Sequence, residues 1–173
     1  MNIFYLDDDP VVCAQQHCDK HVLKMILEYY TLLHIADMEL RKQTRVVMNG
    51  SSYQGYRYRN HPCAKWARAS LANYQYLQKL WLALLEEYTY RWGKQHKYET
   101  YKGCTVLSGT AMENIPKEPF TFPPQSMPWE YQDEHDTRLA YLNYYCGEKT
   151  HLLKYTRRHV PRWITQLGLG EHK

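Results

Sequence analysis

The sequence of 173 residues lacks the short motifs that identify several large enzyme classes. It has no glycine-rich phosphate loop, no Gly-x-Ser-x-Gly nucleophile motif and no zinc-knuckle spacing of Cys and His, which argues against P-loop nucleotidases, α/β-hydrolases and zinc-knuckle proteins. Its five cysteines include no Cys-x-x-Cys pair. We therefore expect free thiols in a reducing cytoplasm, which is the host cytoplasm if a phage encodes the chain.

Long apolar runs are also missing. The best candidate, residues 80–85, is too short to cross a membrane, and the acidic residues 7–9 interrupt the region where a secretory signal would lie. We expect no membrane partner and no signal peptide. The length suits one domain, which we place over residues 1–173 and expect to be a monomer.

Phenylalanine is scarce, whereas tyrosine is abundant. The chain has 3 Phe, 5 Trp and 17 Tyr, a bias typical of aromatic rings used at wet surfaces, where the hydroxyl keeps a partner while the ring stacks. The net charge of +4 permits a polyanion as a partner without requiring one.

The clearest helix signal is at Asp9-Pro10, because an acceptor at the N-cap followed by proline starts a helix well. We predict a helix from Pro10 to about Ala36. Its spacing places four titratable residues on one line, between two apolar strips: His17, His21, Lys24 and Glu28. Charges bordered by apolar surface need partners and often mark a site, although the line could also be a solvated polar face.

A second helical region is predicted between Asn60, as the cap, and Gly93. Pro62 is tolerated in its first turn, and Ser70 marks a break or a second cap. Three polar residues belong to one mostly apolar row: Asn73, Glu87 and Arg91. Of these, we expect Asn73 and Glu87 to be partly buried. Glu87 and Arg91 have the spacing of a helical ion pair, and a structural pair is the commoner use of that spacing.

Basic and aromatic residues mix in two further places. Residues 56–59 read Tyr-Arg-Tyr-Arg, a pattern that suits base stacking and phosphate contacts but also an ordinary exposed loop. Residues 149–162 form a basic stretch that could face phosphates or merely balance the acidic N-terminus. The predicted nucleic-acid contacts on one side of the molecule are Tyr56, Arg57, Tyr58, Arg59, His61, Lys154, Arg157, Arg158 and Arg162.

The remaining segments complete an all-α prediction. Residues 113–131 are rich in proline and should cover the surface as an extended segment, followed by a helix at 133–146. Residues 2–6 form a short extended arm or strand. The sequence thus predicts a compact helical fold with an N-terminal arm and a proline-rich covering segment.

Three blocks of the sequence resemble a family found in tailed phages and some bacteria, which implies no particular activity: NIFYLDDDPVVCAQQHCDKHVLKMILE, NHPCAKWARASLANY and EEYTYRWGKQHK. A more remote resemblance links two runs to the first helix and a later long helix of the pyrimidine-dimer DNA glycosylase (endonuclease V) family: CAQQHCDKHVLKMILE and LANYQYLQKLWLALLEEYTYRWGKQHK.

The second resemblance covers about half of the chain. It implies a compact helical fold whose N-terminal arm threads between helices, and a reaction in which the N-terminal amine attacks the sugar carbon of a flipped nucleotide while a Glu on the first helix assists. His17 stands at the position of a His on that helix. The sequence departs from the pattern because Lys24 occupies the Glu position, with Glu28 as the nearest acid on that face. Asn2 is not a small residue, so we expect Met1 to be retained.

On this basis we predict an enzyme that acts on nucleic acid, most simply a DNA base N-glycosylase or a related base-processing enzyme, without a cofactor. Its partner would be DNA, with RNA or a free nucleotide as alternatives. The candidate roles are an acid at the sugar for Glu28 or Glu87, a donor to the base for His17 or His21, an amine nucleophile for Lys24, and supporting contacts for Asn73 and Arg91.

Two alternatives stay open at this point. One is a metal-assisted or nucleotide-modifying enzyme that uses His17, His21 and Glu87, since two imidazoles four residues apart can share a metal and His61 could add a further ligand. The other is a nucleic-acid-binding module without chemistry, in which the polar line of the first helix is a buried network.

Overall fold

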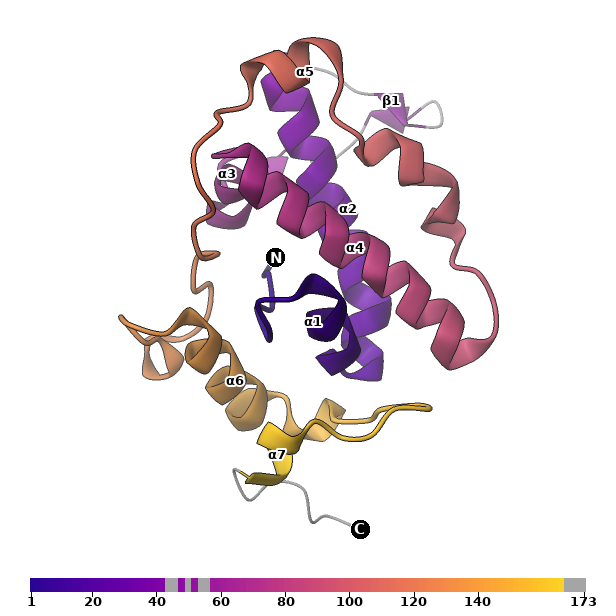
Figure 1. Cartoon of the computed structure of the whole chain (residues 1–173), viewed down its shortest axis with the longest axis vertical. Helices are drawn as coiled ribbons and strands as arrows, with labels where there is room; N and C mark the ends of the chain where they lie inside the picture. Colours follow the sequence, from indigo (N-terminus) through magenta and orange to yellow (C-terminus); the bar gives the residue numbers. More distant parts are fainter. Residues whose placement is uncertain (43–46, 49–50, 53–56, 167–173) are drawn as a thin grey trace.

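The computed structural model describes residues 1–42, 47–48, 51–52 and 57–166, and within these ranges the protein is built from helices (Figure 1). This confirms the all-α prediction. The only strands there are the two-residue pair β1 (Val47–Met48) and β2 (Ser51–Ser52), which pair antiparallel. None of the described helices has both the length and the apolar character needed to cross a membrane.

The N-terminal helical region is two helices rather than one. Asp9 caps α1 (Pro10–Gln16) as predicted, its carboxylate accepting from the amides of Val11 and Val12. The chain then turns extended at His17 and restarts as α2 (Asp19–Leu40). The predicted unbroken helix is therefore wrong at this point.

The break has a tertiary cause. The amide of Cys18 donates to the Tyr145 hydroxyl at 3.1 Å, and the amide of Asp19 donates to the Lys154 carbonyl at 2.8 Å. Residues from the far end of the chain thus bond amides that a continuous helix would have used internally, so a sequence without Pro or Gly here still breaks.

The second helical region follows the prediction closely. It consists of α3 (Pro62–Ala67) and α4 (Leu71–Trp92), separated at Ser70, whose hydroxyl caps α4 by accepting from the amide of Asn73. The helix ends at Gly93, which has the left-handed φ of 68° that glycine tolerates best. The cap of α3 differs from the prediction, because His61 rather than Asn60 accepts the first amide.

The core forms where α2 crosses α4 and the N-terminal arm passes beside them (Figure 1). The arm, residues 1–9, is extended without being a strand. Successive side chains of the arm face different partners: Phe4 packs on Tyr145, whereas Tyr5 packs on Tyr76 of α4. One cluster of buried side chains joins the arm, α2, α3, α4 and the later helix α6 (Thr137–Glu148). A single domain over the whole chain stays a prediction.

The second half of the chain wraps this core. It contains η2 (Lys97–Thr105), α5 (Gly109–Asn114), η3 (Trp129–Tyr131), η4 (Thr150–Leu152) and α7 (Arg162–Gln166) in addition to α6. Residues 115–128 are irregular and lie across α3 and α4, as expected for the proline-rich segment. The predicted extended segment 113–131 is too long at both ends, because residues 113–114 belong to α5 and residues 129–131 form η3. The predicted helix at 133–146 is α6, capped by Asp136 and shifted toward the C-terminus.

Candidate active site

A cavity of about 700 Å³ lies between α2, the N-terminal arm and the end of α6. Three residues of the predicted polar line contribute to its wall: His21, Lys24 and Glu28. The arm contributes Met1, Asn2 and Phe4. The remaining polar wall comes from the second half of the chain and from the start of α2: Ser126, Tyr144, Lys149, His151 and Lys20.

Glu28 lies at the meeting point of α2 and the start of the arm. Its Oε1 is 3.4 Å from the Lys24 ammonium, and its Oε2 accepts from the backbone amide of Asn2 at 3.4 Å. The Asn2 side chain is itself fixed, because its amide donates to the Ser126 carbonyl at 2.9 Å and its oxygen accepts from the Tyr141 hydroxyl at 2.7 Å. The arm is thus held rigidly against the Glu28 carboxylate.

His61 lies near the same point. Burial lowers the pKa of its imidazole, the positive charge at the amino group of Met1 lowers it further, and the Glu28 carboxylate opposes the change. Its Nδ1 accepts from the Cys63 amide at 3.1 Å as the cap of α3. The Glu28 carboxylate therefore acts on His61, which stays beside Tyr58 at the start of α3, its amide donating to the Tyr58 carbonyl at 2.9 Å.

His21 forms the inner wall of the cavity. Its ring stacks on Phe4 with centroids 4.3 Å apart, and its Nδ1 is 2.6 Å from the Tyr145 hydroxyl. Burial lowers the pKa of His21 to about 3, and the charges of His17, Lys149 and Lys24 contribute in the same direction. The imidazole is therefore neutral at neutral pH.

His17 lies outside the cavity, because the break between α1 and α2 takes it off the line of His21. It is fully buried, and both ring nitrogens are engaged: Nδ1 with the Cys13 carbonyl at 2.8 Å and Nε2 with the Tyr29 hydroxyl at 3.1 Å. Because the carbonyl can only accept, Nδ1 carries the hydrogen and Nε2 accepts from Tyr29. Burial lowers the pKa of His17 to about 4. The Tyr29 oxygen also accepts from the Phe4 amide at 3.0 Å, so His17 helps to anchor the arm.

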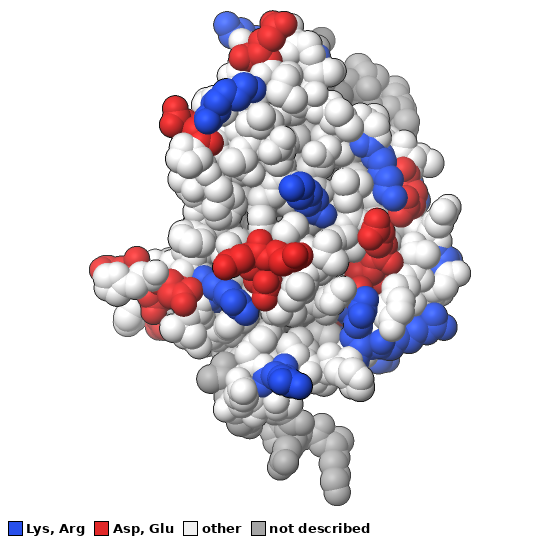
Figure 2. Space-filling model, viewed as in Figure 1, with Lys and Arg blue, Asp and Glu red and all other residues white. Residues whose placement is uncertain are grey.

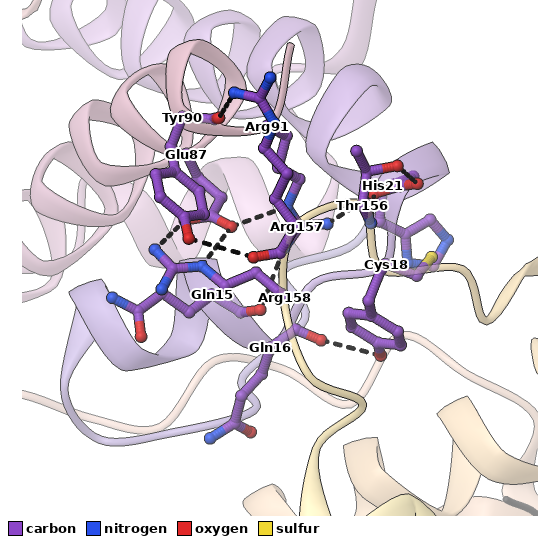
Figure 3. Close-up of polar contacts among 12 residues, drawn as sticks. Gln15, Gln16, Cys18, His21, Glu87, Tyr90, Arg91, Thr156, Arg157 and Arg158 are labelled. Carbon is purple, nitrogen blue, oxygen red and sulfur yellow. Dashed lines mark hydrogen bonds and ion pairs between the residues drawn. The ribbon is translucent and has the colours of Figure 1, made fainter. Parts of the chain in front are cut away.

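Glu87 and Arg91 lie in a separate, buried ionic network (Figure 3). Their side chains pair at 2.7 Å, which confirms the predicted ion pair. Arg91 also pairs with Asp19 at 2.9 Å, and Arg158 pairs with Glu87 at 2.9 Å. Asp19 in turn accepts from the amide and the hydroxyl of Thr156. This network fastens the C-terminal segment to α2 and α4.

The predicted contacts of His21, Lys24 and Glu28 with Asn73, Glu87 and Arg91 do not form, although the charges of Arg91 and Glu87 affect the pKa of His17. Neither Glu87 nor Arg91 lines the cavity, and Asn73 binds the Trp66 carbonyl and Thr121 instead. The arm and α6 cover the line, while Leu23 and Leu27, which were expected to border it under a neighbouring helix, are exposed. The physical reason is that the arm and α6 occupy the face of α2 on which a second helix was expected.

The predicted nucleic-acid contacts are not gathered in one place. Residues 57–61 lead into α3, whereas residues 154–161 lead into α7, and Figure 1 shows α3 and α7 in separate parts of the molecule, above and below α1. Arg158 is occupied by Glu87 and by the Tyr90 ring. On the face drawn in Figure 2, basic and acidic side chains are interspersed. Tyr56 lies outside the described residues. Arg59 belongs to the group before α3, and Arg162 belongs to the group near α7.

The metal hypothesis finds no ligand set in the described part of the chain. No three side chains of His, Cys, Asp or Glu meet there in a way that could hold an ion. The reason is local, since His17 has used both nitrogens in the core and Glu87 is held by two arginines.

Sequence reasoning missed the contribution of the second half of the chain to the cavity. Lys149 and His151 belong to the basic stretch, but nothing in the sequence showed that this stretch would meet α2. Tyr144 and Tyr145 were ordinary members of a tyrosine-rich helix. Their only signal was the excess of tyrosine over phenylalanine, which indicated hydroxyls with polar partners.

Comparison with known proteins gives a family match. The family model described as pyrimidine dimer DNA glycosylase matches residues 1–100, which is more than half of the chain. The match includes the arm, α1 to α4 and the residues around Glu28, and it ends before α6. No curated protein matches, and no solved structure matches.

Proposed function

Because the chain belongs to the pyrimidine dimer DNA glycosylase family, we propose that it cleaves the N-glycosidic bond of a damaged pyrimidine in DNA. The observation that carries this proposal is the meeting of a carboxylate and primary amines in one cavity. Glu28 lies there beside the Lys24 ammonium and the start of the arm. An amine and an acid side by side are what glycosidic cleavage through a covalent sugar intermediate requires.

The proposed reaction is a displacement at the sugar. The amine nitrogen forms a bond to C1′, and the bond between C1′ and the base nitrogen breaks, so that the base leaves with the electron pair and takes up a proton. The amine then loses its proton and the sugar ring opens to an imine, which water hydrolyses to regenerate the amine. Glu28 stabilises the positive charge that develops at the sugar and carries the proton that the amine releases.

Two amines are placed to act beside Glu28. The Lys24 ammonium is in contact with the carboxylate, and the α-amino group of Met1 belongs to the residue next to Asn2, whose amide bonds the same carboxylate. The resemblance noted from the sequence implies the amino-terminal group. The intact mass of the expressed protein shows whether Met1 carries a free amine, so the two candidates can be separated by experiment.

The rest of the cavity suits an extruded nucleotide. Phe4 and Tyr144 have nearly parallel rings, which is favourable for stacking on a base, and the ammonium groups of Lys20, Lys24 and Lys149 can contact flanking phosphates. The Lys149 ammonium already lies 4.7 Å above the Tyr144 ring, so the stacking surface and the positive charge adjoin.

The test is reductive trapping. The protein is incubated with a duplex oligonucleotide that carries one cis-syn thymine dimer, in the presence of borohydride and a chelator, and the covalent product is digested and mapped by mass spectrometry. We expect a protein–DNA adduct on Met1 or Lys24, and none with the undamaged duplex. An adduct on any lysine outside the cavity would assign the chemistry elsewhere, and the absence of both an adduct and glycosidic-bond cleavage would leave a binding function only.

A further inference from the structure

We propose that Tyr145 is a positioning residue that fixes His21 as a neutral hydrogen-bond donor, with the proton on Nε2 directed to a carbonyl oxygen of the base in the cavity. This inference rests on the proposed glycosylase function, and it names the chemical feature of the base that the site recognises. Tyr145 belongs to α6 and lies outside the part of the chain that matches the family model.

The hydrogen bond between Tyr145 and His21 determines which ring nitrogen carries the proton. The Tyr145 hydroxyl is fully buried and 2.6 Å from His21 Nδ1. Its oxygen already accepts from the Cys18 amide at 3.1 Å, so its single hydrogen is free for another group. The Cys18 sulfur is 3.7 Å away and is a weak acceptor, whereas an imidazole nitrogen is a strong one. The hydroxyl therefore donates to Nδ1.

A neutral imidazole that accepts at Nδ1 carries its hydrogen on Nε2. Among the described residues no hydrogen-bond partner is present for His21 Nε2, and His21 is part of the cavity wall. The ring cannot easily turn, because Phe4 stacks on one face and the Tyr145 ring meets it edge-on at 5.0 Å. The donor at Nε2 is thus preorganised before a ligand enters.

The charges around His21 keep the ring neutral. Burial holds its pKa at about 3, and the positive groups that face it, Lys149 directly after α6 and Lys24 from α2, act in the same direction. A neutral imidazole can donate a hydrogen bond through Nε2 but, unlike an imidazolium, does not transfer its proton to the acceptor. Such a donor gains strength as negative charge develops on a carbonyl oxygen.

Base departure produces that charge. When the glycosidic bond of a pyrimidine breaks, the electron pair that remains on the base nitrogen spreads onto the ring carbonyls. A donor fixed at Nε2 therefore binds the departing base more tightly than the bound substrate, which lowers the barrier. The structure thus points to a base with a carbonyl acceptor, such as thymine or uracil, rather than a base that presents an amino group at that position.

The first experiment reads the tautomer directly. Long-range ¹H–¹⁵N correlation spectra of the free protein distinguish Nε2–H, Nδ1–H and the doubly protonated ring of each histidine. We expect His21 as the Nε2–H form in the wild type at pH 7, and a loss of this single form in Tyr145→Phe. An Nδ1–H or doubly protonated His21 in the wild type would overturn the proposal.

The second experiment measures cleavage of the glycosidic bond in the thymine-dimer duplex. It is scored as thymine released after photoreversal of the dimer, because the cyclobutane ring otherwise keeps the cleaved base attached to its neighbour. Tyr145→Phe keeps the ring and removes the hydroxyl, so we expect kcat to fall by roughly tenfold with KM nearly unchanged. Tyr155→Phe is the matched control, because its buried hydroxyl donates only to the Gln16 carbonyl, outside the cavity. Both variants should lose similar thermal stability, and only Tyr145→Phe should lose rate.

The outcomes separate this inference from the function on which it rests. If the wild type releases the base and both variants release it equally fast, the role of Tyr145 is overturned while the glycosylase function stands. If the wild type releases no base, the proposed function fails, and the tautomer spectra still decide whether Tyr145 fixes His21.

Discussion

Two glutamates in this molecule each pair with a basic residue four positions away on the same helix. One pair borders an open cavity, whereas the other is buried. Glu28 pairs with Lys24 on α2, and Glu87 pairs with Arg91 on α4. In the first pair the side chains are 17% and 67% exposed for Glu28 and Lys24, and they face a cavity. In the second pair they are 3% and 0% exposed, and Asp19 and Arg158 complete the network.

The difference shows what separates a structural pair from a candidate catalytic one. In the Glu87 network the charges are matched, two carboxylates against two guanidinium groups, and the cavity that adjoins Glu87 is small, about 120 Å³. Glu28 meets one flexible ammonium and one backbone amide, and the open side of its carboxylate faces the cavity. A substrate has room to approach only the Glu28 carboxylate. Both pairs have the same four-residue spacing, so the spacing alone did not distinguish them.

The largest expected effect comes from breaking the buried network. Arg91→Met keeps much of the side-chain volume but leaves Asp19 and Glu87 with one guanidinium between them. Removing one partner of a buried ionic network typically costs about 3–5 kcal/mol of folding free energy. We expect a loss of this size in urea unfolding, together with unchanged base release by the remaining folded protein.

The control for this change is Arg41→Met, which breaks a more exposed pair with Asp37 at the end of α2. Exposed pairs contribute about 1 kcal/mol or less. If the two variants lose equal stability, the distinction between the buried and the open pair has no energetic content.

The sequence predicted the helix boundaries that depend on neighbouring residues, but not the features that depend on contacts between distant residues. Asp9-Pro10, Ser70 and Gly93 marked three helix boundaries correctly, because capping depends on residues within one turn. The break at His17–Cys18 was missed because it depends on Tyr145 and the carbonyl of residue 154, which are distant in sequence.

The candidate site divides along the same line. The spacing placed His21, Lys24 and Glu28 together because all three belong to α2, and the cavity contains all three. It also included His17, which the break removes, and it looked to α4 for a cover that the arm and α6 supply. Periodicity reports the face of a helix, but it does not identify the segment that packs on that face.

The next effect tests the open carboxylate. Glu28→Gln keeps the size of the side chain and removes its charge, so stabilisation of the cationic sugar should be lost. We expect base release to fall at least about 100-fold, a typical result for the loss of one electrostatic or acid–base group, with little change in melting temperature because the carboxylate is not buried in a network.

Glu86→Gln on the exposed face of α4 is the matched control, since it makes the same chemical change outside the cavity. It should leave base release unchanged. Activity of Glu28→Gln at the wild-type level would remove Glu28 from the mechanism and would move attention to another acid.

The smallest expected effect compares the two histidines that the break separates. The pKa is about 4 for His17 and about 3 for His21, both lowered mainly by burial from an ordinary value near 6.5. Below pH 6.5 the unfolded chain therefore takes up protons that the folded chain refuses, so stability is greatest above pH 6.5 and falls as the pH drops toward these lowered values. Each histidine contributes a loss of up to about 1.4 kcal/mol per pH unit in that window.

His21→Gln removes one of these contributions. We expect its unfolding free energy, measured in urea between pH 7 and pH 5, to fall less steeply than that of the wild type by about 1 kcal/mol per pH unit. Other histidines whose pKa burial lowers, such as the half-buried His34, add the same slope to both proteins and cancel in the difference. Parallel curves would mean that His21 takes up its proton in the folded state near the ordinary pKa. The His21 ring in the cavity wall would then be a cation at mildly acidic pH. Access to water would in that case give His21 a higher pKa than the fully enclosed His17.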